Sequence, residues 1–155
     1  MYLKKGDKAP DFKLLNFDDK LYTLSDFQGS QILIWFFPKA NTPGWILEGI
    51  GFRDEFKKYQ EKNIIVIGVS ADNTAKQKKF VEKFSFPFLM LCDESKEMLK
   101  NYKAWGLKKF MGREYEGIHR ISYLINEDGI IETVFEKVKA KTHANDILNS
   151  FENNI

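Results

Sequence analysis

The sequence contains one cysteine, Cys92, among its 155 residues. A single cysteine cannot close a disulfide within the chain, and the absence of a C-x-x-C motif excludes a disulfide reductase of that type. The two histidines, His119 and His143, are isolated, and no Cys, His and Asp residues cluster at ligand spacing, so we expect neither a metal nor a cofactor. Scarce cysteine also favours a reducing compartment, and we expect a cytoplasmic protein.

Long apolar segments and an excess of one charge are also missing. No run approaches the length of a membrane span, and the first residues, MYLKKGDKAPDF, contain no apolar stretch of signal-peptide length. The 24 Lys and Arg residues nearly balance the 22 Asp and Glu residues. Net charge therefore gives no reason to expect a nucleic acid or a membrane as partner. No repeat or flexible linker divides the chain, and we expect residues 1–155 to form a single domain.

Three short apolar runs predict strands that are buried on both faces. They cover residues 32–37, 64–69 and 88–91, and charged segments of helical period separate them. Such runs are typical of parallel strands that helices cover on both sides. The alternation of strand and helix predicts an α/β fold with a central mixed β-sheet flanked by helices.

The remaining elements follow from turn and capping signals. Strands are expected at residues 12–15, 21–24, 121–125 and 130–135, the last two joined by a hairpin turn at Asn126-Glu127-Asp128-Gly129. Helices are expected around residues 52–59, at 80–84 behind a capping candidate at Asp72, at 94–102, and from a candidate N-cap at Thr142 to residue 151. The basic residues Lys108, Lys109 and Arg113 are expected in a solvated loop.

The segment after the first buried strand carries the chemistry. Thr42 followed by Pro43 predicts an N-cap with proline at the first helical position. Position 45 then lies in the first turn, where unpaired backbone N–H groups and the helix dipole favour negative charge. A cysteine at this position would have a lowered pKa and would be a thiolate near neutral pH.

This segment resembles the active-site motif of peroxiredoxins. Pro38, Thr42 and position 45 have the spacing of the motif PxxxTxxC, and FFPKANTPG with GFRDEF is similar to the bacterioferritin-comigratory-protein, or PrxQ, branch. The resemblance extends over nearly the whole chain, through IGVSAD and WGLKKFMGREYEGIHRISYLI to KVKAKTHANDIL. It implies a thioredoxin-like fold, the reduction of hydrogen peroxide and organic hydroperoxides, a thioredoxin-like external thiol as reductant, and a monomer.

The resemblance also implies roles for individual residues. A thiolate at position 45 would attack the peroxide, and Arg120 would supply positive charge to the thiolate and to the developing oxyanion. The Thr42 hydroxyl would orient the peroxide, and Pro38 would shield the thiolate from bulk water. Each residue also has a structural interpretation: Thr42 as a cap only, Arg120 as a solvated charge at a strand end, and Pro38 as a loop residue.

The chain departs from the family at the residue that matters most, because position 45 is Trp45. An indole forms no thiolate, and the places where the branch carries a resolving cysteine, at Ile50 and around Phe80, hold none either. We therefore expect the chain to be inactive as written, either through a substitution or through natural loss of catalysis. A non-catalytic binding module, with an apolar patch at Trp45 and Ile46, is the alternative.

Two further expectations concern the size of the indole and the remaining thiol. A pocket shaped for peroxide has little spare volume, so overpacking by Trp45 would cost about 1–3 kcal/mol. We expect the indole to swing outward or the first helical turn to unravel. Cys92 is expected to be a buried structural cysteine, since Asp93 and Glu94 beside it disfavour a thiolate.

Overall fold

The computed structural model describes residues 2–37, 43–110, 112–119, 121–135 and 143–152. Within these ranges, the side chains of residues 37, 43–48, 108–110, 115, 145 and 149–152 fall outside the description. Of the sequence-predicted site, Pro38, Thr42 and Arg120 therefore lie outside the described residues, and Trp45 is described by its backbone alone.

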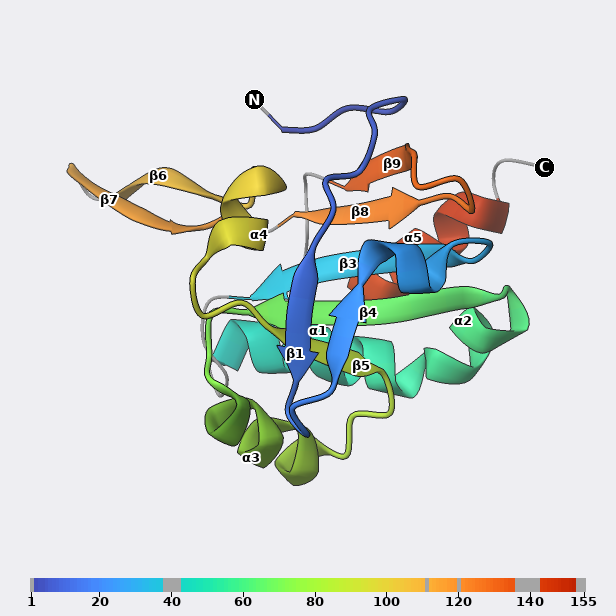
Figure 1. Cartoon of the computed structure of the whole chain (residues 1–155), viewed down its shortest axis with the longest axis horizontal. Helices are drawn as coiled ribbons and strands as arrows, with labels where there is room; N and C mark the ends of the chain where they lie inside the picture. Colours follow the sequence, from blue (N-terminus) through green and yellow to red (C-terminus); the bar gives the residue numbers. More distant parts are fainter. Residues whose placement is uncertain (1, 38–42, 111, 120, 136–142, 153–155) are drawn as a thin grey trace.

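A seven-stranded mixed sheet forms the centre of the molecule (Figure 1). β3, β4 and β5 are parallel, and the other neighbouring strands pair antiparallel. The three apolar runs are these parallel strands, as predicted. In sheet order the strands are β2 (Leu21–Thr23), β1 (Lys13–Asn16), β5 (Leu89–Cys92), β4 (Ile64–Ser70), β3 (Gln31–Phe37), β8 (Ser122–Ile125) and β9 (Ile131–Phe135).

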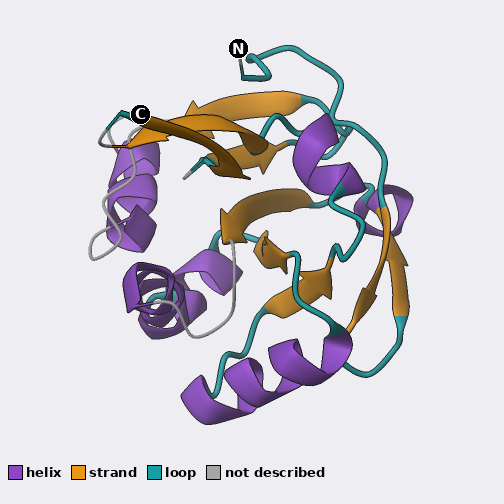
Figure 2. Ribbon diagram, turned by 90° about the vertical axis from the view of Figure 1, so that its left-hand side faces the viewer, coloured by secondary structure: helices purple, strands orange, loops and turns teal. Residues whose placement is uncertain are grey.

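Helices cover both faces of this sheet, as Figure 2 shows from the side. The crossovers β3–α1–β4 and β4–α3–β5 step in the same direction across the sheet, so right-handed connections place α1 and α3 on one face. α5 packs beside α1. The helical segments are η1 (Leu24–Phe27), α1 (Pro43–Asp54), α2 (Phe56–Glu61), α3 (Thr74–Phe84), α4 (Glu97–Asn101) and α5 (His143–Glu152).

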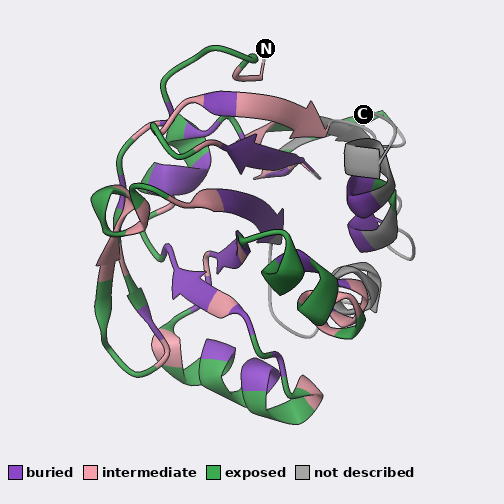
Figure 3. Ribbon diagram, turned by 90° about the vertical axis from the view of Figure 1, so that its right-hand side faces the viewer, coloured by how far each residue is buried: buried purple, intermediate pink, exposed green. Residues whose placement is uncertain are grey.

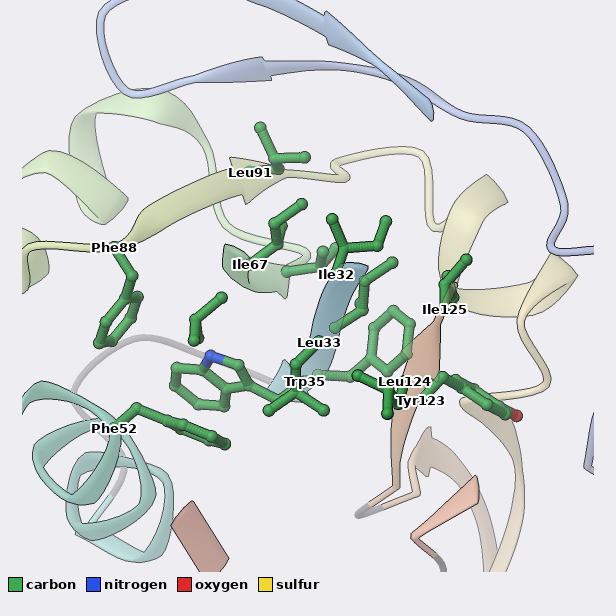
Figure 4. Close-up of a cluster of buried hydrophobic side chains, with 14 of the residues drawn as sticks. Ile32, Leu33, Trp35, Phe52, Ile67, Phe88, Leu91, Tyr123, Leu124 and Ile125 are labelled. Atoms are coloured by element: carbon green, nitrogen blue, oxygen red, sulfur yellow. The ribbon is translucent and has the colours of Figure 1, made fainter. Parts of the chain in front are cut away.

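Neighbouring residues of β3 anchor the two halves of the core. Trp35 packs on Phe52 of α1 with ring centroids 5.3 Å apart, and on Phe88 at 5.9 Å (Figure 4). Phe36 points to the opposite face and meets Tyr102, which directly follows α4, at 5.8 Å. Buried residues are concentrated in the central strands, and most of α3 is exposed (Figure 3). The continuous apolar run of β3 is thus explained by burial on both faces.

The segment expected as a charged loop is instead a β-hairpin. β6 (Trp105–Phe110) and β7 (Arg113–Ile118) pair antiparallel and project from the body of the protein (Figure 1). Lys108, Lys109 and Arg113 therefore lie in strands, and the loop expectation is wrong. The sequence concealed the strands because an exposed two-stranded ribbon needs no buried apolar face, as the exposed Leu107 shows.

One helix cap differs from expectation, and the helical segment that starts at the predicted Pro43 is divided in two. The N-cap of α3 is Asn73, whose Oδ1 accepts a hydrogen bond from Lys76 N at 2.8 Å, and not Asp72. Helical structure after β3 begins at Pro43 and breaks at Glu55 into two helices. The candidate cap Thr142 lies outside the described residues, directly before α5. No helix in the described ranges is long and apolar enough to cross a membrane.

Candidate active site

Position 45 occupies the first turn of α1, where the sequence predicts it. β3 ends at Phe37 and α1 begins at Pro43, so Trp45 is the third residue of the helix. The first turn is helical along its backbone, so the expected unravelling of that turn does not occur. The indole of Trp45 lies outside the described side chains, and its outward orientation stays a prediction. The backbone thus places residue 45 where unpaired amides and the helix dipole favour an anion.

Close packing fixes α1 against the sheet and α3. Gly49 lies so near Phe86 that a Cβ on Gly49 would stand 2.6 Å from the tip of that ring. Arg53, near the end of α1, donates from Nη1 to the carbonyl oxygen of Phe84 at 2.9 Å, which ties the helix to the C-terminal end of α3. Ile50, where the branch carries a resolving cysteine, is half-buried in this helix. The position of α1 is therefore determined along its second half.

β8 begins at Ser122, two residues after Arg120 in the sequence, and it starts beside the end of β3. β8 runs antiparallel to β3 with Ser122 opposite Trp35, so the chain before Ser122 lies beside the end of β3. On one side of residue 120, His119 N donates to the carbonyl oxygen of Ala104 at 2.7 Å. On the other side, Ile121 is buried. The two residues that flank position 120 are therefore both anchored in the fold, and β8 begins beside the end of β3 that leads to α1.

Sequence reasoning missed a buried polar pair beside this edge. Ser122 Oγ and His143 Nε2 lie 2.8 Å apart, and both residues are buried. His143 is the first residue of α5 and packs edge-on against Phe52 of α1 at 5.7 Å. His143, which stands in no ligand cluster of the sequence, thus has a buried hydroxyl as its partner in the fold. The signal for this pair was Ser122, the one small polar residue in the segment Ile121-Ser122-Tyr123-Leu124-Ile125.

Cys92 has the surroundings of a structural thiol. It is buried at the end of β5, and its Sγ donates to Gln77 Oε1 at 3.0 Å. Burial, followed by the carboxylates of Asp72, Glu94 and Asp19, raises the pKa of the Cys92 thiol to about 12. A thiol with that pKa is protonated at neutral pH and is a poor nucleophile.

The sequence suggested that Asp93 disfavours a thiolate at Cys92, but in the structure this carboxyl group caps a helix. Its Oδ2 accepts a hydrogen bond from Leu99 N at 2.8 Å, which holds the first turn of α4. Burial raises the pKa of the Asp93 carboxyl above its usual range, although the hydrogen bonds it accepts oppose this. The carboxylates that act on Cys92 come instead from Asp72, Glu94 and Asp19.

A cleft of about 540 Å³ lies at the other end of the sheet. It is lined by η1, by residues 8–11 and by the turn between β8 and β9, together with Ile32 and Ile125. Ile32 is near the start of β3, whereas α1 follows the end of that strand. This cleft is therefore separate from the candidate site at position 45.

Comparison with known proteins agrees with this geometry. Residues 5–134 match the model of the AhpC/TSA family. The chain is 45% identical over 141 residues to a putative peroxiredoxin bcp of Haemophilus influenzae, covering 91% of both chains. It is 42% identical over 147 residues to peroxiredoxin Bcp of Escherichia coli K12, covering 95% of this chain and 94% of that protein.

Solved structures lead to the same family. A cysteine-to-serine mutant of PrxQ from Xylella fastidiosa superimposes with a TM-score of 0.91 at 26% identity, covering 99% of this chain and 98% of that one. The bacterioferritin comigratory protein of Xanthomonas campestris does so with a TM-score of 0.85 at 25% identity, covering 92% and 91%. With its thioredoxin-like sheet and its helix beginning at Pro43, the chain belongs to the AhpC/TSA family as a peroxiredoxin of the Bcp or PrxQ type.

Proposed function

We propose that the protein is a peroxiredoxin scaffold built for thiol-dependent peroxide reduction, and that Trp45 makes it inactive as written. The supporting observation is the start of α1 at Pro43, because it places residue 45 in the first helical turn, at the end of a buried strand. Position 45 of the scaffold is suited to a thiolate, but the residue at this position is a tryptophan.

The chemistry that the scaffold fits needs a sulfur at position 45. A thiolate attacks one peroxide oxygen, the O–O bond breaks, and the leaving oxygen takes a proton, which yields a sulfenic acid and water or an alcohol. Backbone N–H groups of the first turn would stabilise the thiolate. Arg120 would hold the thiolate and the developing oxyanion, Thr42 would orient the peroxide, and Pro38 would exclude water.

Cys92 does not replace the missing sulfur. It lies on β5, a strand that β4 separates from β3 in the sheet, and its thiol is buried and hydrogen-bonded. Its raised pKa leaves almost no thiolate near neutral pH. The protein therefore lacks a reactive thiol in the described structure.

The test is peroxide consumption in the presence of a small dithiol. We expect the chain as given to stay at background and Trp45→Cys to consume hydrogen peroxide. Adding Arg120→Ala to Trp45→Cys should lower the rate about 100-fold, the usual cost of removing one group that stabilises developing negative charge.

Cys92→Ser in the Trp45→Cys background is the matched control and should leave the reaction with peroxide intact. Because Ile50 cannot resolve the sulfenic acid, turnover should depend on the added thiol, and excess peroxide should oxidise the enzyme further. If the unmodified chain consumes peroxide and Cys92→Ser abolishes that consumption, the active site is at Cys92 instead.

For the enzyme with a thiol at position 45, we propose hydrogen peroxide and organic hydroperoxides as substrates and a thioredoxin-like thiol as reductant. The Xanthomonas campestris relative is described by its alkyl peroxide reduction activity. A cytoplasmic monomer that uses neither nucleic acid nor membrane completes this proposal.

A non-catalytic binding module is the alternative, and no specific observation favours it. Among the described side chains, the large hydrophobic residues that are exposed are Leu15, Leu21 and Leu107. Leu107 lies on the projecting hairpin, and Leu15 and Leu21 lie on the β1–β2 pair, so they do not form one patch near position 45. A Trp45→Cys variant without peroxide activity would favour this alternative.

A further inference from the structure

We propose that the buried hydrogen bond between Ser122 and His143 aligns β8, the strand that follows Arg120 in the sequence, with the helix that carries position 45. Both are then positioning residues for the peroxide reaction and act through Arg120 and α1. The proposal rests on the proposed function, because it concerns the geometry of the same site.

The pair joins β8 to the helices that follow position 45. Ser122 opens β8, two residues after Arg120, and is paired with Trp35 on β3. Opposite residues in an antiparallel pair share a face, so the Ser122 side chain is on the same face as Trp35, the face that α1 covers. His143 meets it there from the first residue of α5, at 2.8 Å.

The start of α5 is in turn fixed to the helices after position 45. The ring of His143 packs edge-on against Phe52 of α1, with an interplanar angle of 85°. The carbonyl oxygen of Ala144 accepts a hydrogen bond from the Tyr59 hydroxyl of α2 at 2.7 Å. A Cβ on Gly51 would be 3.6 Å from the Ala144 Cβ, so the two helices approach closely. α1, α2 and the first turn of α5 therefore behave as one packed unit.

The hydrogen bond connects this unit to the strand that follows Arg120. Apolar contacts alone tolerate small displacements, since they are non-directional, whereas a hydrogen bond fixes one distance and one direction. Ser122 and His143 are buried at 0% and 3% exposure, so each is costly to bury unless it is hydrogen-bonded. A buried, hydrogen-bonded polar pair stabilises the folded state little more than an apolar pair of the same shape would. What the Ser122–His143 pair adds is a fixed alignment of β8 with α5.

Alignment matters because peroxide reduction needs the thiolate, the arginine and the peroxide in one geometry. A misplacement of about 1 Å can lower the rate of a positioned reaction about 100-fold. Loss of the Ser122–His143 bond lets β8 shift relative to α1, with no loss of any group that contacts the peroxide. We expect Ser122→Ala to lower the rate of peroxide reduction about 10-fold, less than full misplacement would.

The first experiment uses the Trp45→Cys background and measures the rate of reaction with hydrogen peroxide together with the thermal midpoint. Ser122→Ala and His143→Phe should slow the reaction about 10-fold, and Ser122→Thr, which keeps the hydroxyl, should restore most of the rate. Tyr102→Phe is the matched control. It removes a hydrogen bond of 2.6 Å to the carbonyl oxygen of Pro10 and should lower the midpoint but leave the rate unchanged.

The second experiment uses the chain as given and needs no activity. Ser122→Ala should speed amide hydrogen exchange at both the start of β8 and the start of α5, whereas Tyr102→Phe should not. A Trp45→Cys protein that does not react with peroxide would refute the proposed function. The hydrogen-exchange measurement would still test whether the Ser122–His143 bond aligns β8 with α5. The inference would be overturned if Ser122→Ala left amide exchange in β8 unchanged. It would also be overturned if, in the Trp45→Cys background, Ser122→Ala reacted with peroxide as fast as Tyr102→Phe.

Discussion

Cys92 and residue 45 show how differently one fold treats two positions. The end of β5 surrounds a thiol with carboxylates and buries it, which keeps it protonated. The start of α1 offers amide groups and the positive end of a helix dipole, which would ionise a thiol. The single cysteine of the sequence therefore lies where thiol chemistry is suppressed, and the position that favours it holds Trp45.

Replacing Cys92 tests its structural role. Cys92→Ala removes the donor to Gln77 Oε1 and should lower the free energy of unfolding by about 1 kcal/mol, whereas Cys92→Ser keeps a donor and should cost less. Urea unfolding measures both. In the native chain the thiol should react slowly with a disulfide reagent and quickly after unfolding, and fast labelling without unfolding would contradict this assignment.

Asp93 predicts a pH dependence of stability. Its pKa is raised by burial, so the folded protein holds this proton to a higher pH than the unfolded chain does. Folding therefore loses stability at this group as pH rises from about 4, the ordinary value, through the raised pKa. Asp93→Asn keeps an oxygen to accept from Leu99 N and should remove this loss.

The measurement is the difference in free energy of unfolding between the native chain and Asp93→Asn across that pH window. The native chain should become relatively less stable as pH rises. A difference that does not change with pH would show that Asp93 is not proton-linked to folding.

The second half of helix α1 contains two glycines, Gly49 and Gly51, and one of them is tightly packed. Glycine costs about 1 kcal/mol relative to alanine inside a helix, so a glycine there indicates a close contact or a tolerated weakness. Gly49 shows the first case, since its position leaves no room for a Cβ beside Phe86. Gly51 shows the second, because a Cβ there meets only Ala144 at an ordinary 3.6 Å.

The two glycines therefore predict opposite effects of the same substitution. Gly49→Ala should lower the free energy of unfolding by about 1–3 kcal/mol through overpacking against Phe86, which is stacked on Phe88 at 5.0 Å. Gly51→Ala should raise it by up to about 1 kcal/mol through helix propensity. Denaturant unfolding of the pair provides its own control, and equal effects at both positions would refute the packing argument.

In the molecule as a whole, the arrangement of the site follows from topology. β3 leads into α1, and β8 returns beside β3 in the opposite direction, so residues far apart in sequence meet at one edge of the sheet. The buried pair of Ser122 and His143 joins this edge to α5. The same scaffold carries Cys92 two strands away from β3, separated from the site.

The sequence by itself determined most of the sheet and the place of residue 45. Apolar runs predicted β3, β4 and β5 because strands buried on both faces admit few polar residues. Thr42-Pro43 predicted the start of α1, since proline suits a first helical turn and little else in a helix. These signals lie within a few neighbouring residues, so they predict the strands and the helix start without information on which elements pack against them.

Only the tertiary structure decided which residues meet across the fold. The hairpin β6–β7 was hidden because its middle residues are mostly exposed or charged, and strand pairing in such a segment leaves no continuous apolar pattern. The partnership of Ser122 with His143 spans 21 residues and depends on how α5 docks beside α1. Contacts of this kind arise when whole helices and strands pack together. The local sequence around each contacting residue does not reveal its partner.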